Sequence, residues 1–240
     1  MMQENKLLIV IPARGGSKGF PGKNCKNIGG IPLLSWSWDA VKASGLQNPT
    51  CILSTDDEGI AKIGRSVGLD VPFLRPKEIS KDLSTDYEFI IHALNWLKEN
   101  QHYCPDIILH LRPTQPHRKV GDIDKCLKIF IENINDYDSL RSIVPFEKSP
   151  YKMYTINDNE LKPLFQKINS KNEPFNLCRQ NLPQAYLHNG YIDIYKASVI
   201  KNGILSGEKI YPYIMSKKDT IDIDTEEDWK KAENYFLFFS

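Results

Sequence analysis

The sequence predicts an α/β fold in which helices cover both faces of a mainly parallel sheet. Short apolar runs of the kind found in buried strands alternate along the chain with segments of helical periodicity. A glycine-rich turn follows the first of these runs directly. With 240 residues, of which 41% are hydrophobic, the chain can bury one substantial core. We therefore expect a single Rossmann-like domain over residues 1–240, with its ligand crevice at the carboxyl ends of the parallel strands.

The strand-like segments begin with residues 7–12, an almost wholly apolar run that suits a strand buried on both faces. Further strands are expected at residues 50–54, 71–74, 106–111, 140–144, 190–195 and 210–215. Helices are expected at residues 32–43, 57–67, 84–100, 121–133 and 225–238. In the third helix the apolar side chains recur at helical spacing, at Ile90, Ile91, Leu94 and Leu97. This order of strands and helices favours parallel pairing.

Residues 148–187 break the alternation of strands and helices. The segment is polar, lacks a long amphipathic helix and carries four of the 15 prolines, at positions 150, 163, 174 and 183. A stretch of about 40 residues without a core of its own needs another surface to lie against. We expect an inserted arm that packs on a second subunit, and hence a homodimer. A surface excursion of a single subunit is the alternative that stays open.

Composition and charge exclude several classes of protein. The formal net charge of +1 argues against a general nucleic-acid binder, which needs a basic surface. The sequence has no apolar run of the roughly 20 residues that span a bilayer, so no membrane partner is expected. Residues 7–13 lead into a glycine-rich turn and do not follow the plan of a signal peptide. Five widely spaced cysteines without a C-x-x-C pair favour reduced thiols and a cytoplasmic location.

The turn at residues 13–24 has the composition of a phosphate-binding loop. It follows the first strand and contains four glycines, which allow backbone N–H groups to converge on one point. No acidic residue lies between Asn5 and Trp38, whereas five basic residues do: Lys6, Arg14, Lys18, Lys23 and Lys26. The loop matches neither the P-loop nor the dinucleotide fingerprint. A basic, solvent-exposed turn is the simpler alternative.

The segment Ile221-Asp222-Ile223-Asp224 is predicted to bind a divalent cation. Alternation along a strand places both isoleucines on one face and both carboxylates on the other. Two neighbouring carboxylates are unfavourable without a cation or hydrogen-bond donors, and Mg²⁺ commonly takes one or two carboxylates plus substrate phosphates. Mg²⁺, or Mn²⁺ in its place, is therefore the expected cofactor. The alternative is a strand end that leads into a helix cap, because Thr225 and Asp228 have the spacing of a capping box.

Five motifs in order resemble those of the acylneuraminate cytidylyltransferases, the CMP-sialic acid synthetases. The first is I-P-A-R-G-G-S-K-G-x-P-x-K-N at residues 11–24. The others are L-S-T-D at 53–56, L-R-P-T-Q-P at 111–116, R-Q-N-L-P-Q at 179–184 and I-D-I-D-T at 221–225. The resemblance covers nearly the whole chain, and it implies the nucleotidyltransferase type of Rossmann-like fold.

The resemblance implies transfer of CMP from CTP to a sialic-acid-like sugar of nine carbons, with release of pyrophosphate. It assigns the nucleotide to Arg14, Gly16, Ser17, Lys18, Lys23, Asn24, Ser84 and Thr85. It assigns catalysis to Lys18, Arg14 and Asp222, and it agrees with a metal on Asp222 and Asp224. It assigns the sugar side to Arg112, Gln115, Lys152, Arg179, Gln184, Asn189 and Asp193. Enzymes of this family dimerise through an arm that matches residues 148–187, and some arm residues reach the partner's site.

Three departures from the family pattern fall on the sugar side. Arg112 stands where a glutamine is frequent, and Asp193 stands where many relatives have a tyrosine. Leu205-Ser206 replaces an aromatic pair associated with the N-acyl pocket. The arginine favours a legionaminic-type sugar over N-acetylneuraminic acid or the deaminated sialic acid. We expect Arg112 or Arg179 to bind the sugar carboxylate, because a guanidinium fork matches that group.

Two other functions stay open from the sequence. A CMP-Kdo synthetase also has a loop ending in P-G-K, as at residues 21–23, but the motif at 179–184 and the arm speak against it. A non-catalytic CTP-binding relative is disfavoured because it would not need Lys18 together with paired carboxylates. His117 and Arg118 follow a strand end, where their side chains could face either the crevice or the core.

Overall fold

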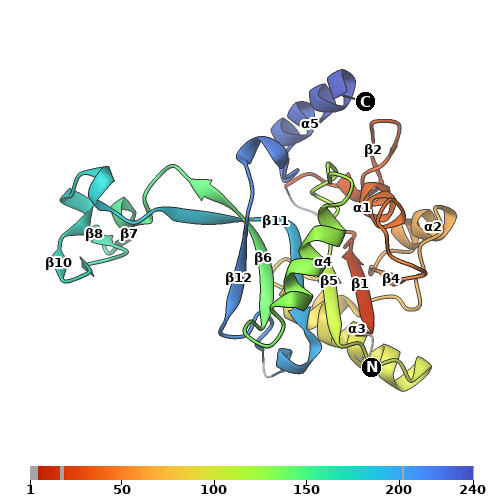
Figure 1. Cartoon of the computed structure of the whole chain (residues 1–240). Coiled ribbons are helices and arrows are strands. Elements are labelled where there is room, and N and C mark those ends of the chain that lie inside the picture. The colour runs from red at the N-terminus through yellow and green to blue at the C-terminus, as the bar shows by residue number, and fades with distance from the viewer. Residues whose placement is uncertain (1–4, 17–18, 202, 240) are drawn as a thin grey trace.

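A computed structural model describes residues 5–16, 19–201 and 203–239 of the chain. A six-stranded sheet in the order β12-β6-β11-β5-β1-β4 forms the centre (Figure 1). The strands are β1 (Leu7–Pro12), β4 (Thr50–Ser54), β5 (Ile107–His110), β6 (Ser139–Phe146), β11 (Ala185–Lys196) and β12 (Ile210–Ile214). Only β11 is antiparallel to its two neighbours in this sheet. The predicted mainly parallel sheet is confirmed.

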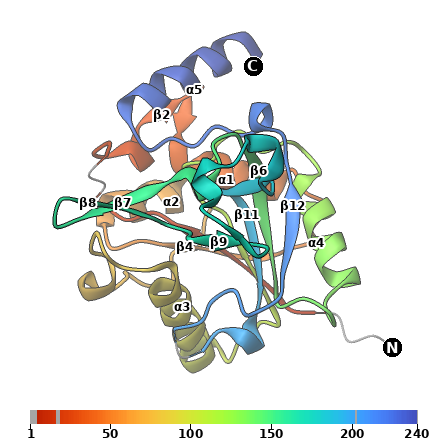
Figure 2. The same ribbon diagram turned by 90° about the vertical axis from the view of Figure 1, so that its left-hand side faces the viewer.

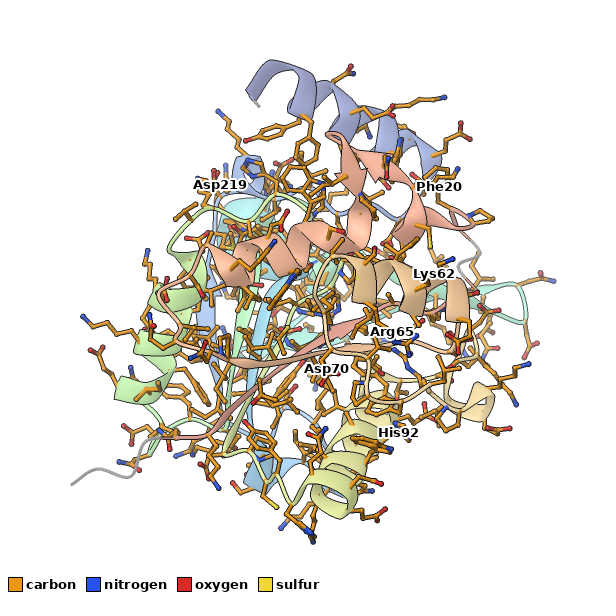
Figure 3. All side chains as sticks on the ribbon, turned by 90° about the vertical axis from the view of Figure 1, so that its right-hand side faces the viewer. Phe20, Lys62, Arg65, Asp70, His92 and Asp219 are labelled. Carbon is orange, nitrogen blue, oxygen red and sulfur yellow. The ribbon has the colours of Figure 1, made fainter. Side chains whose placement is uncertain are left out.

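Helices cover both faces of the sheet because alternate residues of its strands point into two separate cores. Ile9 and Ile11 of β1 pack with α1 (Leu33–Lys42), α2 (Glu58–Ser66) and α4 (Asp122–Glu132). Leu8 and Val10 pack against α3 (Asp86–Gln101) on the opposite face (Figure 2). In Figure 3, Lys62 and Arg65 mark α2, His92 marks α3, and Asp70 lies between them. With both faces covered, β1 is apolar along its length, as a buried parallel strand should be.

A third, smaller core joins the closing helix α5 (Glu226–Phe239) to the glycine-rich loop. Trp229, Ala232 and Phe236 of α5 pack there with Phe20 and Ile28. The short strands β2 (Asn27–Ile28) and β3 (Ile31–Pro32) pair beneath the helix. Among the helices of the described residues, none combines the length and the apolar character that a membrane span requires.

Capping side chains set the start of three helices close to the predicted positions. Asp57 accepts a 2.8 Å hydrogen bond from the amide of Ile60 at the start of α2. Thr85 and Glu88 form a capping box before α3. Thr225 and Asp228 exchange bonds of 3.0 and 3.2 Å before α5. Each pair satisfies amides that the first turn of a helix leaves without partners.

Two predicted strands are wrong. Residues 71–74 form no strand, because this part of the chain makes only two isolated bridges, from Asp70 to Ile52 in β4 and from Leu74 to Thr55 just after it. Pro72 between them has no N–H to donate to a ladder. Residues 221–224 also have irregular backbone. The alternation predicted there nevertheless holds in part, because Ile223 is fully buried and Asp224 is exposed.

The segment predicted to be an arm begins where the paired ends of β6 and β11 leave the sheet. It contains β7 (Tyr154–Asn157) paired with β8 (Glu160–Pro163), and β9 (Lys167–Ile168) paired with β10 (Lys171–Asn172). These small hairpins project away from the body, to the left in Figure 1. Every residue of β7 is exposed. The arm thus has little core of its own.

Candidate functional site

A cavity of about 430 Å³ opens at the carboxyl ends of β1 and β5, where the fold predicts the ligand crevice. Its wall comes from the loop after β1, the segment before α3, the loop after β5 and the residue Asp224. The lining residues are Pro12, Arg14, Gly19, Lys23, Asn24, Arg75, Ile79, Lys81, Ser84, Thr85, Asp86, Phe89, Arg112, Pro113, Thr114 and Asp224. Five of these are cations and two are carboxylates. The excess of positive charge suits a polyanion such as a triphosphate.

The loop after β1 is held by contacts with two other predicted motifs. The amide of Gly15 donates a 2.9 Å bond to Asp56, the last residue of the motif at 53–56. A Cβ at Gly19 would lie 2.5 Å from the carbonyl oxygen of Asp224, so only glycine permits this approach. The side chain of Asn24 is buried and donates 3.2 Å to the carbonyl of Arg14. The glycine-rich loop is therefore in direct contact with the segment that carries the paired carboxylates.

Arg14 and the residues just before α3, to which the resemblance assigns the nucleotide, face the cavity. Arg14 forms a 3.1 Å ion pair with Asp82, and Ser84 and Thr85 line the same space. At Gly16 a Cβ would meet no atom of the described residues within 4 Å. Ser17 and Lys18 lie outside the described residues, so their predicted roles stay predictions.

Lys23 lies between the loop and the segment that carries the two carboxylates. Its ammonium donates 2.7 Å to the carbonyl of Ile223 and pairs with Asp224 at 3.0 Å. The residue is only 8% exposed, although it reaches the cavity wall. Lys23 thus binds the carboxylate segment within this chain, in addition to any contact with a ligand.

Asp222 and Asp224 flank the fully buried Ile223, whose amide donates 2.9 Å to the carbonyl of Thr114. Asp222 is exposed, yet partial desolvation by the surrounding protein raises the pKa of its carboxyl, and the charge of Asp224 raises it further. Such a pair favours a cation that neutralises both groups. No cluster of three or more His, Cys, Asp and Glu side chains in the described part of the chain could hold a metal. The donor set therefore fits Mg²⁺ only if substrate phosphates complete it.

Arg112 forms part of the wall and is held by two carboxylates. One guanidinium nitrogen bonds to Asp193 and the other lies 2.5 Å from Asp86. Gly190, which has a φ of +67°, packs against the side chain of Arg112. A Cβ at this position would lie 3.2 Å from Cδ of Arg112. Burial alone would lower the pKa of Arg112, but the charges of Asp193 and Asp86 raise it above its usual range. The guanidinium is therefore a fixed and permanent positive charge.

Three residues predicted to bind the sugar lie behind the wall. Asp193 has no exposed surface, Gln115 is 1% exposed and Asn189 is 7% exposed. The side-chain amide of Gln115 donates to the carbonyl of Asn189, and Asp193 also contacts Arg141 and His188. None of the three lines the cavity. Their placement makes them supports of the wall, and a direct contact with the sugar stays a prediction.

The other predicted sugar residues lie on or beside the arm. Lys152 donates 3.1 Å to the carbonyl of Phe175. Arg179 and Gln184 line a separate cavity of about 30 Å³, next to Glu147. The arm projects from the body (Figure 1). None of these three side chains lines the main cavity of its own chain.

Five residues of the cavity were not predicted from the sequence: Arg75, Ile79, Lys81, Asp86 and Phe89. Arg75 is 5% exposed, donates to Ser54 at 2.5 and 3.1 Å, and lies 4.8 Å from the centre of the Phe89 ring. Burial lowers its pKa to about 10, so it stays charged at neutral pH. Its signal was a single arginine in the otherwise apolar stretch 71–76.

His117 and Arg118, whose side chains were expected to face either the crevice or the core, lie in different surroundings. His117 contacts the hydroxyl of Tyr235 on α5 at 2.5 Å. Arg118 is 9% exposed and does not line the cavity, so it faces the core.

Comparison with known proteins places the chain in a family. The model of the Cytidylyltransferase family matches residues 8–225. A CMP-N,N'-diacetyllegionaminic acid synthase of Legionella pneumophila subsp. pneumophila is 33% identical over 239 residues, covering 95% of each chain. An N-acylneuraminate cytidylyltransferase of Streptococcus agalactiae serotype V is 29% identical over 97% of this chain and 54% of its own length. A solved CMP:2-keto-3-deoxy-manno-octonic acid synthetase superposes with a TM-score of 0.67, at 17% identity, over 97% of this chain and 99% of the other. The protein belongs to the cytidylyltransferase family.

Proposed function

We propose that the protein transfers CMP from CTP to a nine-carbon sugar acid of the sialic or legionaminic type and releases pyrophosphate. The observation that carries the proposal is the cavity itself, in which five cations surround a space bordered by Asp224. The two relatives named for CMP-sugar formation support it, since they are aligned with nearly all of this chain. All five cysteines are free thiols, which supports a reducing, cytosolic location.

The proposed chemistry is an in-line attack of the sugar hydroxyl on the α-phosphorus of CTP. Such a transfer depends chiefly on alignment and on neutralising charge. Arg14 and Lys23, together with Lys18, would bind the triphosphate and the leaving pyrophosphate. Mg²⁺ or Mn²⁺, held by Asp222 and Asp224 together with the phosphates, would supply positive charge at the reacting group. Either aspartate would also orient the attacking hydroxyl or accept its proton.

For the sugar carboxylate we propose Arg112 as the partner within the chain. Arg112 lines the cavity, whereas Arg179 lies at the base of the arm. Two N–H groups of Arg112 are used by Asp86 and Asp193, but the side chain remains 20% exposed and keeps other donors toward the cavity. A legionaminic-type sugar is the first choice, supported by the 33% identity to the legionaminic acid synthase.

We also propose that two copies of the chain form a homodimer through the arm. The arm exposes several apolar side chains, namely Tyr154, Ile156, Leu161, Leu164 and Phe165. Exposed apolar residues gathered on a projecting segment are typical of a surface that another protein covers. In such a dimer Lys152 and Arg179 would be available to the cavity of the partner subunit.

The reaction can be tested by measuring pyrophosphate release from CTP and Mg²⁺ with four sugar acids in parallel. The acids are N-acetylneuraminic, di-N-acetyl-legionaminic, deaminated neuraminic and Kdo. We expect turnover with a nine-carbon acid, and its loss in Asp222→Asn. Turnover with Kdo alone would instead support a CMP-Kdo synthetase, whose fold the chain shares. Binding of CTP without release from any acid would contradict the proposal and indicate a non-catalytic relative.

A further inference from the structure

Arg118 is a buried cation whose hydrogen bonds go to one loop and its neighbours. Its guanidinium donates 2.9 Å to the carbonyl of Tyr191 and 2.7 Å to that of Gln115. It also donates 2.9 Å to the carbonyl of Arg112 and 2.9 Å to the hydroxyl of Ser37. Four donors of one planar group are thus directed at fixed acceptors, which only arginine can provide.

These bonds determine the position of a cavity wall that has no regular secondary structure. Residues 111–116 follow β5 as irregular backbone, and Arg112, Pro113 and Thr114 line the cavity. Arg118 connects the two ends of this segment to β11 through Tyr191 and to α1 through Ser37. Burial lowers the pKa of Arg118 to about 10, which still leaves it charged at neutral pH. Because residues 111–116 have no regular secondary structure, removing the bonds from Arg118 should leave their positions less well ordered.

The same wall holds the two carboxylates. The carbonyl of Thr114 accepts the amide of Ile223 at 2.9 Å, and Asp222 and Asp224 flank Ile223 in the chain. Lys23 donates to the carbonyl of Ile223 from the other side, at 2.7 Å. A displacement of Thr114 would therefore be transmitted to Asp222 and Asp224.

We propose that Arg118 is a positioning residue for the transfer reaction. It fixes residues 112–116 and, through Thr114, the pair Asp222 and Asp224, without contacting a substrate itself. The kinetic part of this inference rests on the proposed function. A misplacement of about 1 Å at a reacting group costs on the order of a hundredfold in rate, so small movements of the wall matter.

The test compares Arg118→Lys with Phe130→Leu, a buried substitution in α4 at a residue that does not line the cavity and makes no hydrogen bond through its side chain. Lysine keeps the charge but cannot make the four bonds. We expect Arg118→Lys to lower kcat about 10- to 100-fold while the KM for CTP changes less than about threefold. Amide exchange at Ile223, followed by NMR, should become at least about tenfold faster. Phe130→Leu should show neither change when its urea unfolding midpoint is matched to that of Arg118→Lys.

The inference is overturned if Arg118→Lys keeps the wild-type kcat and the wild-type exchange at Ile223, or if Phe130→Leu reproduces both effects. If Arg118→Lys does not fold, Ser37→Ala is used in its place, because it removes one of the four bonds. Unchanged amide exchange at Ile223 in Ser37→Ala would also overturn the inference. If the wild type releases no pyrophosphate with any sugar acid, the proposed function fails. The exchange comparison then decides the positioning role by itself.

Discussion

Replacing Arg112 by methionine should destabilise the folded protein, because Asp193 stays buried while it loses one of its cations. Asp193 has no exposed surface, and its three partners are Arg112, Arg141 at 3.3 Å and His188 at 2.9 Å. Removing one partner of a buried ion pair costs about 3–5 kcal/mol when no other partner remains. Since two partners remain here, we expect a loss of about 2 kcal/mol in the free energy of unfolding.

The effect of pH supplies a second signature of the same pair. Burial alone would raise the pKa of Asp193, but the bond from His188 and the charge of Arg112 hold it well below its usual range. A carboxyl with a lowered folded-state pKa stabilises the protein above its unfolded value of about 3.9. That contribution is lost as the pH falls from there toward the folded-state pKa. Without Arg112 the folded-state pKa of Asp193 rises, so acid unfolding should begin at a higher pH.

The assay is urea unfolding of the wild type, Arg112→Met, Asp193→Asn and the double variant. At pH 7 the double-mutant cycle should give a coupling energy of about 1–2 kcal/mol. The stability difference between the wild type and Arg112→Met should be largest above about pH 5 and shrink below about pH 4. A loss under about 0.5 kcal/mol, additive energies, or a difference that does not shrink in acid would refute the reasoning.

Three further predictions follow from the cavity and the arm. Gly19→Ala would place a Cβ 2.5 Å from the carbonyl of Asp224, so it should lower the free energy of unfolding in urea by about 1–3 kcal/mol. Gly16→Ala, whose Cβ would meet no atom of the described residues within 4 Å, should cause no such loss, and equal losses would contradict this. Arg75→Met should weaken CTP binding at least about tenfold by calorimetry, since a buried charge of the cavity is lost, and an unchanged Kd would remove Arg75 from the site. Ile156→Glu should convert a dimer to a monomer in light scattering, because Ile156 is 77% exposed on the arm; a dimer that survives would place the interface elsewhere.

Local patterns were sufficient to predict most of the fold. The apolar run of β1 and the caps at Asp57 and Thr225 act over a few residues, so the sequence alone reveals them. The strand predicted at 71–74 failed because Pro72 interrupts the ladder, a signal that was present and was not used. The irregular backbone at 221–224 depends on the bond from Ile223 to Thr114, which the sequence does not contain.

The candidate site was harder to predict because its supports come from distant segments. Arg112 and Asp193 both suggested sugar contacts, yet only the fold shows that Asp193 lies behind Arg112 and holds it. Arg75 was missed because its role depends on the position of the Ser54 carbonyl and the Phe89 ring. Long-range pairing of polar groups is decided by tertiary structure, and composition or periodicity does not report it.

The most direct test of the account follows the α-phosphate of CTP. The protein is incubated with CTP labelled at that phosphate, Mg²⁺ and a nine-carbon sugar acid, and the labelled products are separated by chromatography. We expect the label to appear in a CMP-sugar, with one pyrophosphate released per transfer, and we expect Asp224→Asn to stay folded but lose the transfer. Label that remains in CTP with every acid, or transfer undiminished in Asp224→Asn, would contradict this expectation.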